Sequence, residues 1–452
     1  MKDLVVWSTP ETLMQPEVSP GFHHLQAASW PALRSSLWEA AESSGEFLGM
    51  IWFGGRVEVS PHAWQRCRSA ADSGADLIYG DYRTPQELVR TLDSEPGSLR
   101  EEFDTGPLWC VQREALRAAL SELPDAISSP SAVRYGLRLA FLRGRTSRLP
   151  EPLTQVQKRP GDDLFGYVRA DARIEQAELE TVLTDHLRRI GAWLPPRTAP
   201  YGDDGPYPVH ASVVIPVRNR ARTIGDAVAS ALHQKTGFSF NVLVVDNHSA
   251  DGTPAQARQA AGGNARLHVI IPDRHDLGIG GCWNVASCSP LAGRFLVQLD
   301  SDDVYASDQS LHTMVTLIDS GPWAMAVGAY TTVDMAGREV SPGLVDHREW
   351  TAENGHNNLL RVSGIGAPRT LATAFVRAFP FPNVSYGEDY SMALQVSRRH
   401  HVARTHECVY LARRWEGNTD HCVRPEVARD REAYKNRLRT MEILARAKEG
   451  TL

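Results

Sequence analysis

The feature that most constrains the fold is an alternation of short apolar stretches with helical patterns in the second half of the chain. The stretch "ASVVIPV" at 211–217 predicts a buried strand, because its residues are apolar and mostly β-branched. The helical pattern "RTIGDAVASALHQ" follows it, and the apolar stretches "NVLVVDN" and "LHVIIP" continue the alternation. Such alternation is typical of an α/β domain with a mainly parallel sheet. We therefore expect an α/β fold class.

A proline-rich segment divides the chain. The 452 residues are long for one domain, so two domains are expected. The segment "PPRTAPYGDDGPYP" holds five prolines and two glycines, which exclude a helix or a central strand. The division predicted from this is 1–194, a linker at 195–208, a second domain at 209–423 and a C-terminal helix at 424–452.

The two predicted domains share a weak internal similarity. "GRFLVQLDSDDVY" from Gly293 aligns with "GEFLGMIWFGGRV" from Gly45, and "DSGPWAMAVGAY" at 319–330 aligns with "DSGADLIYGDY" at 72–82. The offset stays at 247 or 248 residues, which favours a duplication over chance similarity between two α/β segments. We expect the first copy to be a smaller α/β domain that lacks most of the first βαβ half.

Charge and cysteine content exclude several classes of protein. The net charge of -6 argues against a general nucleic-acid binder. No segment reaches the roughly 18 apolar residues of a membrane span, and the N-terminal apolar run is too short for a signal peptide. The six cysteines form no C-x-x-C pair, which fits reduced thiols. These features predict a cytoplasmic protein without an integral membrane segment.

Polar residues gather where the predicted strands end. In open α/β sheets, ligands bind at the carboxyl ends of the strands. Each cluster alone could be a helix cap, as Ser249 or Asp251 could be. Four clusters in succession are harder to explain in that way. The clusters are Arg218 and Asn219; Asp246, Asn247, Ser249 and Asp251; Asp276, Gly278 and Asn284; and Asp300, Asp302 and Asp303.

These clusters, in this order, resemble the motifs of a known family. The segments are "IPVRN", "VVDNHSADGT", "DLGIGGCWN", "LDSDD" and "GEDY". Together they are similar to the family 2 glycosyltransferases with the GT-A fold, over roughly Ser212 to Asp420. The resemblance implies an inverting, divalent-metal-dependent glycosyltransferase that moves a sugar from a nucleotide sugar to an acceptor hydroxyl by single displacement.

The resemblance also implies a set of donor-binding residues. Asp246 ends its strand where a carboxylate could accept the N–H of a pyrimidine ring, so a UDP-sugar is the expected donor. The turn after the first strand could meet the base and the ribose. The expected nucleotide-sugar contacts are Pro216, Val217, Arg218, Asn219, Asp246, Asn247, Ser249, Asp276, Gly278, Asn284, Asp300 and Ser301.

The implied metal site lies in "LDSDD". Mn²⁺ or Mg²⁺ prefers oxygen ligands and takes few protein carboxylates when a diphosphate is present. Asp302 is the expected direct ligand, and Asp300 would bind the ribose or a metal-bound water. Asp303 could be a ligand or a structural cap. Relatives have a histidine after the base, and here His421 or Glu416 could complete the site, unless His421 is a surface residue.

The implied catalytic base is Asp389, with Glu388 orienting it or the acceptor. Asp389 opens a helical pattern, so it could also act as an N-terminal cap, and the two roles are compatible. Gly364 lies in a segment expected to line the substrate, and Trp415 could stack on a sugar or pack in the core. "LARRW" resembles the Q-x-x-R-W motif of processive synthases, but Leu411 replaces the glutamine, so a processive synthase is not expected.

The first copy is expected to lack this chemistry. Its alignment places Trp52 at the position of Asp300, Gly54 and Gly55 at the next two acids, and Ser131 near the base. It could bind an acceptor, form a homodimer interface or only stabilise its partner domain. The acceptor class stays open between a small molecule, a glycolipid, a peptide and a glycan.

Two other functions compete with this interpretation. A nucleotidyltransferase would need a Gly-rich, basic phosphate loop, and "PVRNRARTIG" is not one. A catalytically inactive carbohydrate- or partner-binding scaffold would not need the acids of the second copy.

Overall fold

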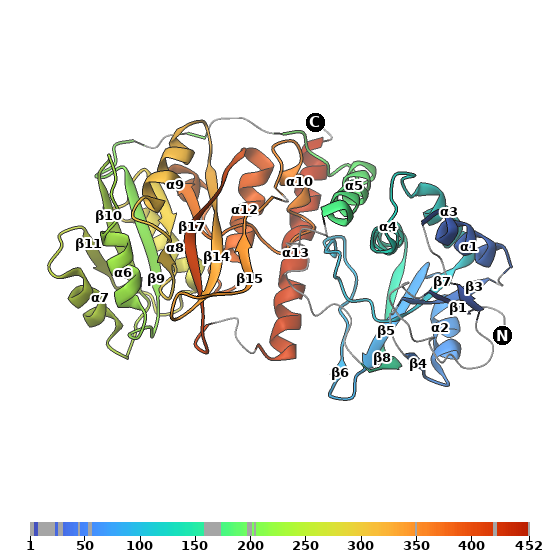
Figure 1. Cartoon of the computed structure of the whole chain (residues 1–452). Coiled ribbons are helices and arrows are strands. Elements are labelled where there is room, and N and C mark those ends of the chain that lie inside the picture. Colours follow the sequence, from blue (N-terminus) through green and yellow to red (C-terminus); the bar gives the residue numbers. More distant parts are fainter. Residues whose placement is uncertain are drawn as a thin grey trace. The chain divides into compact units, whose positions relative to one another are not determined.

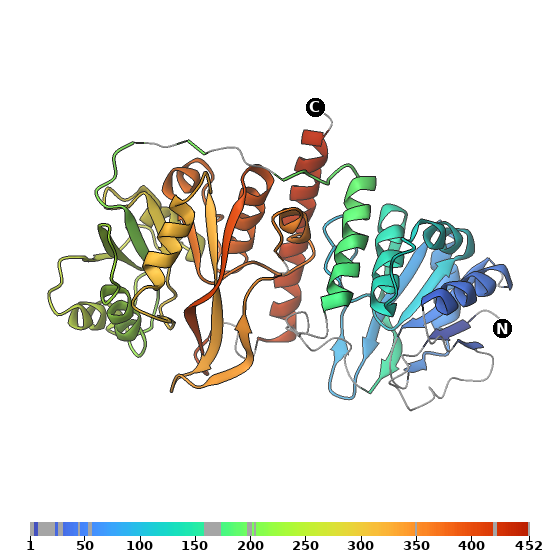
Figure 2. The same cartoon turned by 45° about the horizontal axis from the view of Figure 1, so that its top comes forward.

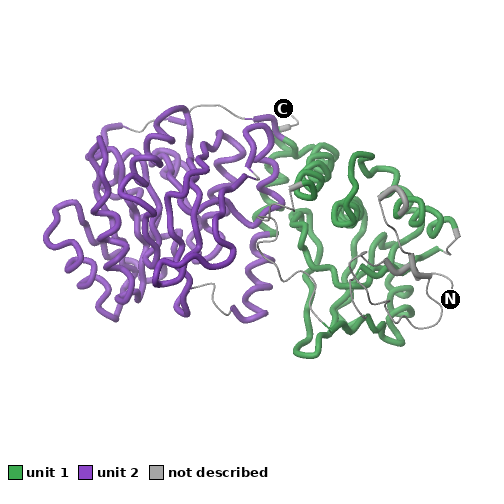
Figure 3. Tube along the Cα trace, viewed as in Figure 1, with its two compact units in different colours: residues 1–193, 436–452 green, residues 194–435 purple. Residues whose placement is uncertain are grey.

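The computed structural model divides the chain into two compact units, coloured separately in Figure 3. Unit 1 comprises Met1–Trp193 and Asn436–Leu452, and unit 2 comprises Leu194–Lys435. The structure describes residues 4–7, 23–25, 30–43, 46–52, 57–157, 173–196, 201–202, 205–348, 350–418 and 423–450.

Unit 2 is an α/β unit built on a nine-stranded sheet (Figure 1). Its elements, in chain order, are β9 (Ala211–Val217), α6 (Ile224–Leu232), β10 (Phe240–Asp246), α7 (Thr253–Ala261), β11 (Leu267–Ile270), α8 (Ile279–Cys288), β12 (Phe295–Gln298), β13 (Val304–Tyr305), α9 (Ser310–Asp319), β14 (Met325–Asp334), β15 (Glu339–Val345), α10 (Gly355–Asn358), β16 (Arg369–Ala372), α11 (Thr373–Ala378), α12 (Glu388–Arg399) and β17 (Val402–Arg414).

The sheet of unit 2 has the order β11-β10-β9-β12-β16-β14-β17-β13, with β15 paired to β14. The first four strands are parallel, so the α/β prediction is confirmed there; β16 then pairs antiparallel with both β12 and β14. Strand β10 is buried along its whole length, as expected for a strand covered by helices on both faces. The carboxyl ends of β9, β10 and β12 consequently meet at one edge of the sheet.

Two sets of helices cover this sheet. Alternate residues of β9, such as Val213 and Ile215, pack in one core with apolar side chains of α6 and α9. Helix α8 packs against β9 and β10, and its buried residues include Cys282 and Trp283. The helices connect parallel strands, and they leave the loops at the strand ends to supply polar groups.

Unit 1 contains an eight-stranded sheet (Figure 2). Its elements are β1 (Leu4–Trp7), β2 (His23–Leu25), α1 (Trp30–Ser43), β3 (Phe47–Trp52), β4 (Val57–Val59), α2 (Ala63–Ala71), β5 (Leu77–Arg83), β6 (Leu88–Val89), β7 (Leu108–Gln112), α3 (Arg113–Glu122), α4 (Pro130–Arg143), β8 (Thr146–Val156) and α5 (Arg173–Arg189).

Apart from β11 at one edge of the unit 2 sheet, the two sheets have the same strand order. Unit 1 runs β2-β1-β3-β7-β5-β8-β4 with β6 on β5, and unit 2 runs β10-β9-β12-β16-β14-β17-β13 with β15 on β14. Corresponding pairs also agree in direction. Even the irregular register coincides: it falls at Gly80–Tyr82 of β5 and at Val327–Tyr330 of β14, 247 or 248 residues later.

Unit 1 retains more of the first half than the alignment led us to expect. Strands β1 and β2 pair in parallel, as β9 and β10 do. The difference comes next: only residues 26–29 separate β2 from α1, whereas α7 and β11 separate β10 from α8. These four residues are too few to hold a counterpart of α7 and β11, and so of the residues from Asn247 to Gly278.

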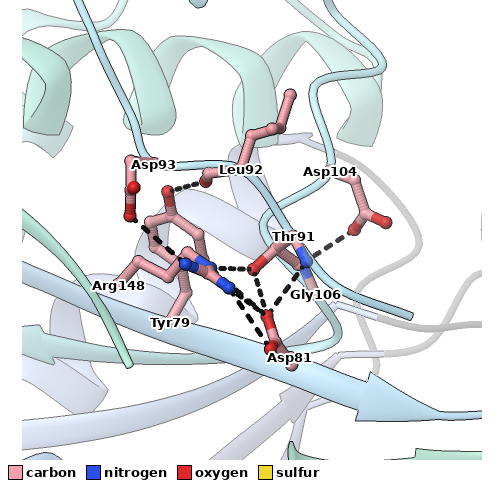
Figure 4. Close-up of polar contacts among 8 residues, drawn as sticks. All are labelled: Tyr79, Asp81, Thr91, Leu92, Asp93, Asp104, Gly106 and Arg148. Carbon is pink, nitrogen blue, oxygen red and sulfur yellow. Dashed lines mark hydrogen bonds and ion pairs between the residues drawn. The ribbon is translucent and has the colours of Figure 1, made fainter. Parts of the chain in front are cut away.

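A buried ion pair joins β5 to β8 in unit 1 (Figure 4). Asp81 is 3% exposed, and its Oδ1 accepts hydrogen bonds from Arg148 Nη2 at 3.0 Å and from the Thr91 backbone N–H at 3.0 Å. The Tyr79 hydroxyl donates to the Leu92 carbonyl over 2.5 Å. These contacts attach the segment after β6 to the sheet.

Helix α13 (Pro425–Gly450) does not belong to one unit alone. The unit boundary falls inside it, between Lys435 and Asn436. The described residues of the proline-rich segment 195–208 form neither helix nor strand. Among the helices of the described residues, none is long and apolar enough to cross a membrane.

Candidate active site

Asp300 lies two residues after the end of β12 and is the first acid of the site. Its backbone N–H donates to the Tyr410 hydroxyl at 3.0 Å, and its Oδ1 accepts from Gln298 Nε2 at 3.1 Å. Burial, together with the neighbouring Asp302 and Asp389 carboxylates, raises the pKa of Asp300 to about 6. Neighbouring carboxylates that repel one another favour either a shared proton or a bound cation.

Asp302 is held by two donors from the segment after β17. Its Oδ2 accepts from Trp415 Nε1 at 3.2 Å and from Asn418 Nδ2 at 3.1 Å. Asn418 also accepts from the Trp415 backbone N–H at 2.7 Å, which fixes this turn. Trp415, expected to stack on a sugar or to pack in the core, therefore orients an acid. Asn418 was not among the predicted residues.

Asp303 is bound within the fold. It is 7% exposed, and its Oδ1 accepts from the Arg413 backbone N–H at 2.7 Å. Burial raises the pKa of Asp303 well above its usual range, and Asp300 and Asp302 add to the effect. Arg413 also donates to the Asp302 carbonyl and pairs with Asp226 at 2.7 Å. These contacts favour the structural alternative for Asp303.

Asp389 lies in the first turn of α12. The helix begins after Gly387, whose positive φ of 76° suits a glycine. Asp389 Oδ2 accepts from Arg369 Nη2 at 2.6 Å, and the Asp389 side chain is 34% exposed. Burial alone would raise the pKa of Asp389, but Arg369, followed by Lys435, holds it below its ordinary value. An ionised, partly exposed carboxylate is suited to accept a proton.

Glu388 contrasts with its neighbour. It is 9% exposed, and its Oε2 is buried without a hydrogen-bond partner among the described residues. Burial, then the Asp389 charge, raises the pKa of Glu388 to about 8. The pKa values of the two adjacent carboxyl groups therefore differ in opposite directions from their ordinary values, with Glu388 protonated and Asp389 ionised near neutral pH.

Asp246 ends β10 with one unused oxygen. The residue is 1% exposed; Oδ2 accepts from the Ser249 N–H at 3.1 Å, and Oδ1 has no partner among the described residues. Asn247 Nδ2 donates to the Leu277 carbonyl at 2.7 Å, while its Oδ1 is likewise buried without a partner. Buried polar atoms are normally paired, so these oxygens point to an absent ligand.

The turn after β9 is tied to the turn after β10. The Asn219 N–H donates to Ser249 Oγ at 2.8 Å, and Asn219 Oδ1 accepts from the Ala250 N–H at 2.9 Å. Asp251 accepts from the Ala221 N–H at 3.0 Å and from the Thr253 N–H at the start of α7. Ser249 and Asp251 therefore hold the turn that follows β9. Pro216 and Val217 end that strand, and Arg218 begins the turn.

The third predicted cluster is used mainly inside the protein. Asn284 and the Phe381 backbone exchange two hydrogen bonds, at 2.8 and 2.9 Å. The Gly278 N–H donates to Asn383 Oδ1 at 2.8 Å, and Asp276 forms an exposed ion pair with Arg274 at 2.6 Å. The contacts of Asn284 and Gly278 connect α8 to the segment before α12, the helix that contains Asp389.

The remaining predicted residues are dispersed. Glu416 is exposed and pairs with Arg222 at 3.1 Å, Ser301 is 8% exposed, and Gly364 is half-buried. His421 lies outside the described residues. Within the described ranges, no three His, Cys, Asp or Glu side chains come together as a ready metal site. Two residues that the motifs did not predict, Gln298 and Arg369, contact the acids directly.

Polar groups at the strand ends of an α/β sheet, with one acid ionised and unused buried oxygens nearby, define an enzyme domain that binds a polar ligand. Residues 212–373 match the sequence profile of the family described as Glycosyl transferase family 2. Unit 2 therefore contains a family 2 glycosyltransferase domain, and the family predicted from the motifs is confirmed.

Several known proteins are similar to part of this chain. The succinoglycan biosynthesis protein ExoO of Rhizobium meliloti (strain 1021) is 38% identical over 127 residues, which are 28% of this chain and only 35% of the relative. The Escherichia coli protein WfgD, a UDP-Glc:α-D-GlcNAc-diphosphoundecaprenol β-1,3-glucosyltransferase, is 25% identical over 42% of this chain and 71% of its own length. TarS 1–349 of S. aureus, solved with UDP-GlcNAc, is 22% identical with a TM-score of 0.41, over 52% of this chain and 72% of that one.

Proposed function

We propose that unit 2 transfers a sugar from a nucleotide sugar to an acceptor hydroxyl with inversion at the anomeric carbon. The observation that carries this proposal is the ionised Asp389 carboxylate, paired with Arg369 at 2.6 Å within a domain of this family. A base that stays deprotonated near neutral pH is what a single displacement requires of the protein.

Asp389 takes the proton of the acceptor hydroxyl as that oxygen attacks the anomeric carbon. The new C–O bond forms on one face of the sugar while the bond to the donor diphosphate breaks on the other. The diphosphate leaves with the electron pair. Protonated Glu388, beside the base, can donate a hydrogen bond to the acceptor and does not compete for its proton.

The acids after β12 fit a divalent cation. Asp300 and Asp302 are close enough to raise the pKa of Asp300, and Asp302 is fixed by Trp415 and Asn418. Asp302, with Asp300 directly or through water, would hold Mn²⁺ or Mg²⁺, whose charge would stabilise the departing diphosphate. His421 and Glu416 stay candidates for a further ligand.

The donor is proposed to carry uridine diphosphate. Support comes from the buried Asp246 Oδ1 and Asn247 Oδ1, which lack partners at the end of β10. An acceptor oxygen in this place suits the N–H of a pyrimidine ring. WfgD, which is 25% identical over 42% of this chain, uses a UDP-sugar according to its name.

Unit 1 is proposed to be a copy of the same fold without the chemistry. Support comes from the shared strand order and from the aromatic residues at the equivalent site: Trp52 and Trp109 have ring centroids 5.5 Å apart and are 5% and 0% exposed. The missing counterpart of 247–278 removes the positions of four expected nucleotide contacts, Asn247, Ser249, Asp276 and Gly278. Unit 1 would then act by binding an acceptor, by forming a dimer interface or by stabilisation.

The test is a panel of nucleotide sugars, first in a thermal-shift measurement and then in an assay of nucleotide release with Mn²⁺ and with EDTA. We expect a UDP-sugar to stabilise the protein and Mn²⁺ or Mg²⁺ to be needed for turnover. Binding of glycans without nucleotide release from any donor would favour the scaffold alternative. Release of pyrophosphate from a nucleoside triphosphate would favour a nucleotidyltransferase.

A further inference from the structure

We propose that Arg369 is the positioning residue of this site, one guanidinium that holds Asp389 directly and Asp300 through Gln298. The inference rests on the proposed function, because it assumes that Asp389 is the base. It adds a residue that none of the motifs contains, and it places both acids in one hydrogen-bonded chain.

The chain of contacts crosses two paired strands. Arg369 is the first residue of β16, Gln298 is the last residue of β12, and these strands pair antiparallel. Arg369 Nη2 donates to Asp389 Oδ2 at 2.6 Å, and Nη1 donates to Gln298 Oε1 at 3.0 Å. Gln298 Nε2 then donates to Asp300 Oδ1 at 3.1 Å. The Gln298 amide orientation follows from these contacts, since its oxygen faces two Arg369 donors and its nitrogen faces a carboxylate.

The guanidinium is enclosed by its own loop. Nε donates to the Ile365 carbonyl at 2.5 Å and Nη2 to the Gly366 carbonyl at 3.3 Å. Gly366 has a φ of 88°, and a Cβ at this position would lie 2.7 Å from Arg369 Cγ. The Arg369 side chain is 11% exposed. All three nitrogens therefore donate within the protein, which assigns the cation to holding the acids and the loop.

Unit 1 shows what the same strands look like without this chain. β12 pairs with β16 at Phe295 and Ala372, and β3 pairs with β7 at Phe47 and Gln112. Counting back three residues from the last partner of each pair places Trp109 at the position of Arg369. Trp52 already corresponds to Asp300, so the cation and the acid are replaced together by two contacting tryptophans. The same strand pairing therefore forms with either set of residues.

The other charges that face Asp389 come from three elements. Lys435 of α13 acts in the same direction as Arg369, and the Asp300 carboxylate after β12 acts against it. Glu388 on the same helix is protonated near neutral pH and acts against Arg369 only when it is ionised. Arg369 is the strongest cationic influence and bonds directly to the base. Removing it should therefore move the titration of Asp389 upward, by about 1–3 pH units.

The experiment compares Arg369→Gln, Arg369→Lys, Asp389→Asn and the double variant Arg369→Gln/Asp389→Asn. The measured quantities are kcat, KM and the pH dependence of kcat/KM with a saturating metal ion. Arg338→Gln is the matched control, because Arg338 pairs with Asp334 at 2.6 Å on an exposed turn, with its side chain 80% exposed.

We expect Arg369→Gln to lower kcat by about 10–10²-fold and to move the acid limb of kcat/KM to higher pH by about 1–3 units. Arg369→Lys retains a positive charge, so its acid limb of kcat/KM should lie close to that of the wild type. Arg338→Gln should leave kcat and the acid limb unchanged. In the Asp389→Asn background, Arg369→Gln should cost less than about twofold further. An unmoved acid limb in Arg369→Gln, or full additivity in the double variant, would overturn the inference.

A second measurement does not depend on turnover. Because the folded-state pKa of Asp389 lies below its unfolded value, its contribution to stability is present above about pH 4 and is lost as the pH falls through the folded pKa. The Tm difference between the wild type and Arg369→Gln should therefore shrink between pH 5 and pH 3, and it should not do so in the Asp389→Asn background. If the Tm difference shrinks in this way but the wild type transfers no sugar, the proposed function alone is refuted. A pH-independent Tm difference with an active wild type refutes the Arg369 inference alone.

Discussion

The indole Nε1 of Trp415 donates a hydrogen bond to Asp302 Oδ2 over 3.2 Å. With Asn418 on the same oxygen, this contact fixes the rotamer of the acid proposed to bind the metal ion. Two neutral donors orient this acid without the positive charge that a salt bridge to arginine would bring. The tryptophan thus orients the acid that is proposed as the metal ligand.

Asp302→Asn should abolish the metal-dependent part of the activity. We expect turnover of the wild type to be lost with EDTA and restored by Mn²⁺, and the variant to need a far higher Mn²⁺ concentration or to stay inactive. The measurement is a Mn²⁺ titration of nucleotide release. Asp308→Asn is the control, because Asp308 pairs with Lys235 at 2.6 Å on the surface beyond β13. Equal Mn²⁺ dependence in Asp302→Asn and the wild type would contradict the assignment.

Asp389→Asn should separate binding from chemistry. The amide cannot accept the acceptor proton, so kcat should fall by about 10²–10⁴-fold, while the nucleotide sugar still stabilises the protein in a thermal-shift measurement. Asp334→Asn, on the exposed turn before β15, serves as the matched control for the substitution. Retained turnover in Asp389→Asn would rule out this residue as the base.

Glu388→Gln should stabilise the protein relative to the wild type, and this gain should grow as the pH rises from acid to alkaline. The folded-state pKa of Glu388, about 8, lies above its unfolded value, so the folded state binds a proton that the unfolded state has released. Between about pH 4.5 and pH 8 this costs stability as the pH rises, up to a few kcal/mol. The glutamine has no such cost. The check is Tm against pH for both proteins; parallel curves would mean that Glu388 titrates normally.

Breaking the Asp81–Arg148 pair should destabilise unit 1. Asp81→Ala leaves a buried guanidinium that is only 13% exposed, and loss of one partner of such a pair costs about 3–5 kcal/mol. Hydrogen exchange of the β5 and β8 amides is the suitable measurement, because it reports on one unit. Glu151→Gln is the control: Glu151 pairs with Arg66 at 2.8 Å, with both side chains more than a third exposed, so the cost should be at most about 1 kcal/mol. Equal exchange in the two variants would contradict a stabilising role.

The fold class and the acids could be predicted from the sequence because their signals are local. Asp302 follows an apolar stretch within a few residues, and Asp389 opens a helical pattern, so a short window contains both the element and its polar end. The similarity of unit 1 to unit 2 could be predicted for a different reason: the offset between the two aligned segments stays at 247 or 248 residues.

The connections between the acids could not be predicted in this way. Gln298 bonds to Arg369 across 71 residues, and Asp302 to Asn418 across 116. No periodicity or spacing records such a partner, because β16 reaches β12 only through the sheet. For the same reason its motif does not indicate that Asn284 bonds to the Phe381 backbone, 97 residues away.

Helix α13 has a consequence for how the two units can be separated. Residues 436–450 complete unit 1, although the whole of unit 2 precedes them in the chain. The Gly97 N–H, for example, donates to Thr440 Oγ1 at 2.8 Å within unit 1. A ribosome releases the early part of unit 1 long before this contact can form, and a chain cut at the proline-rich segment would yield neither unit whole. Unit 2 is in effect an insertion into unit 1, so a single cut between the two units cannot separate them.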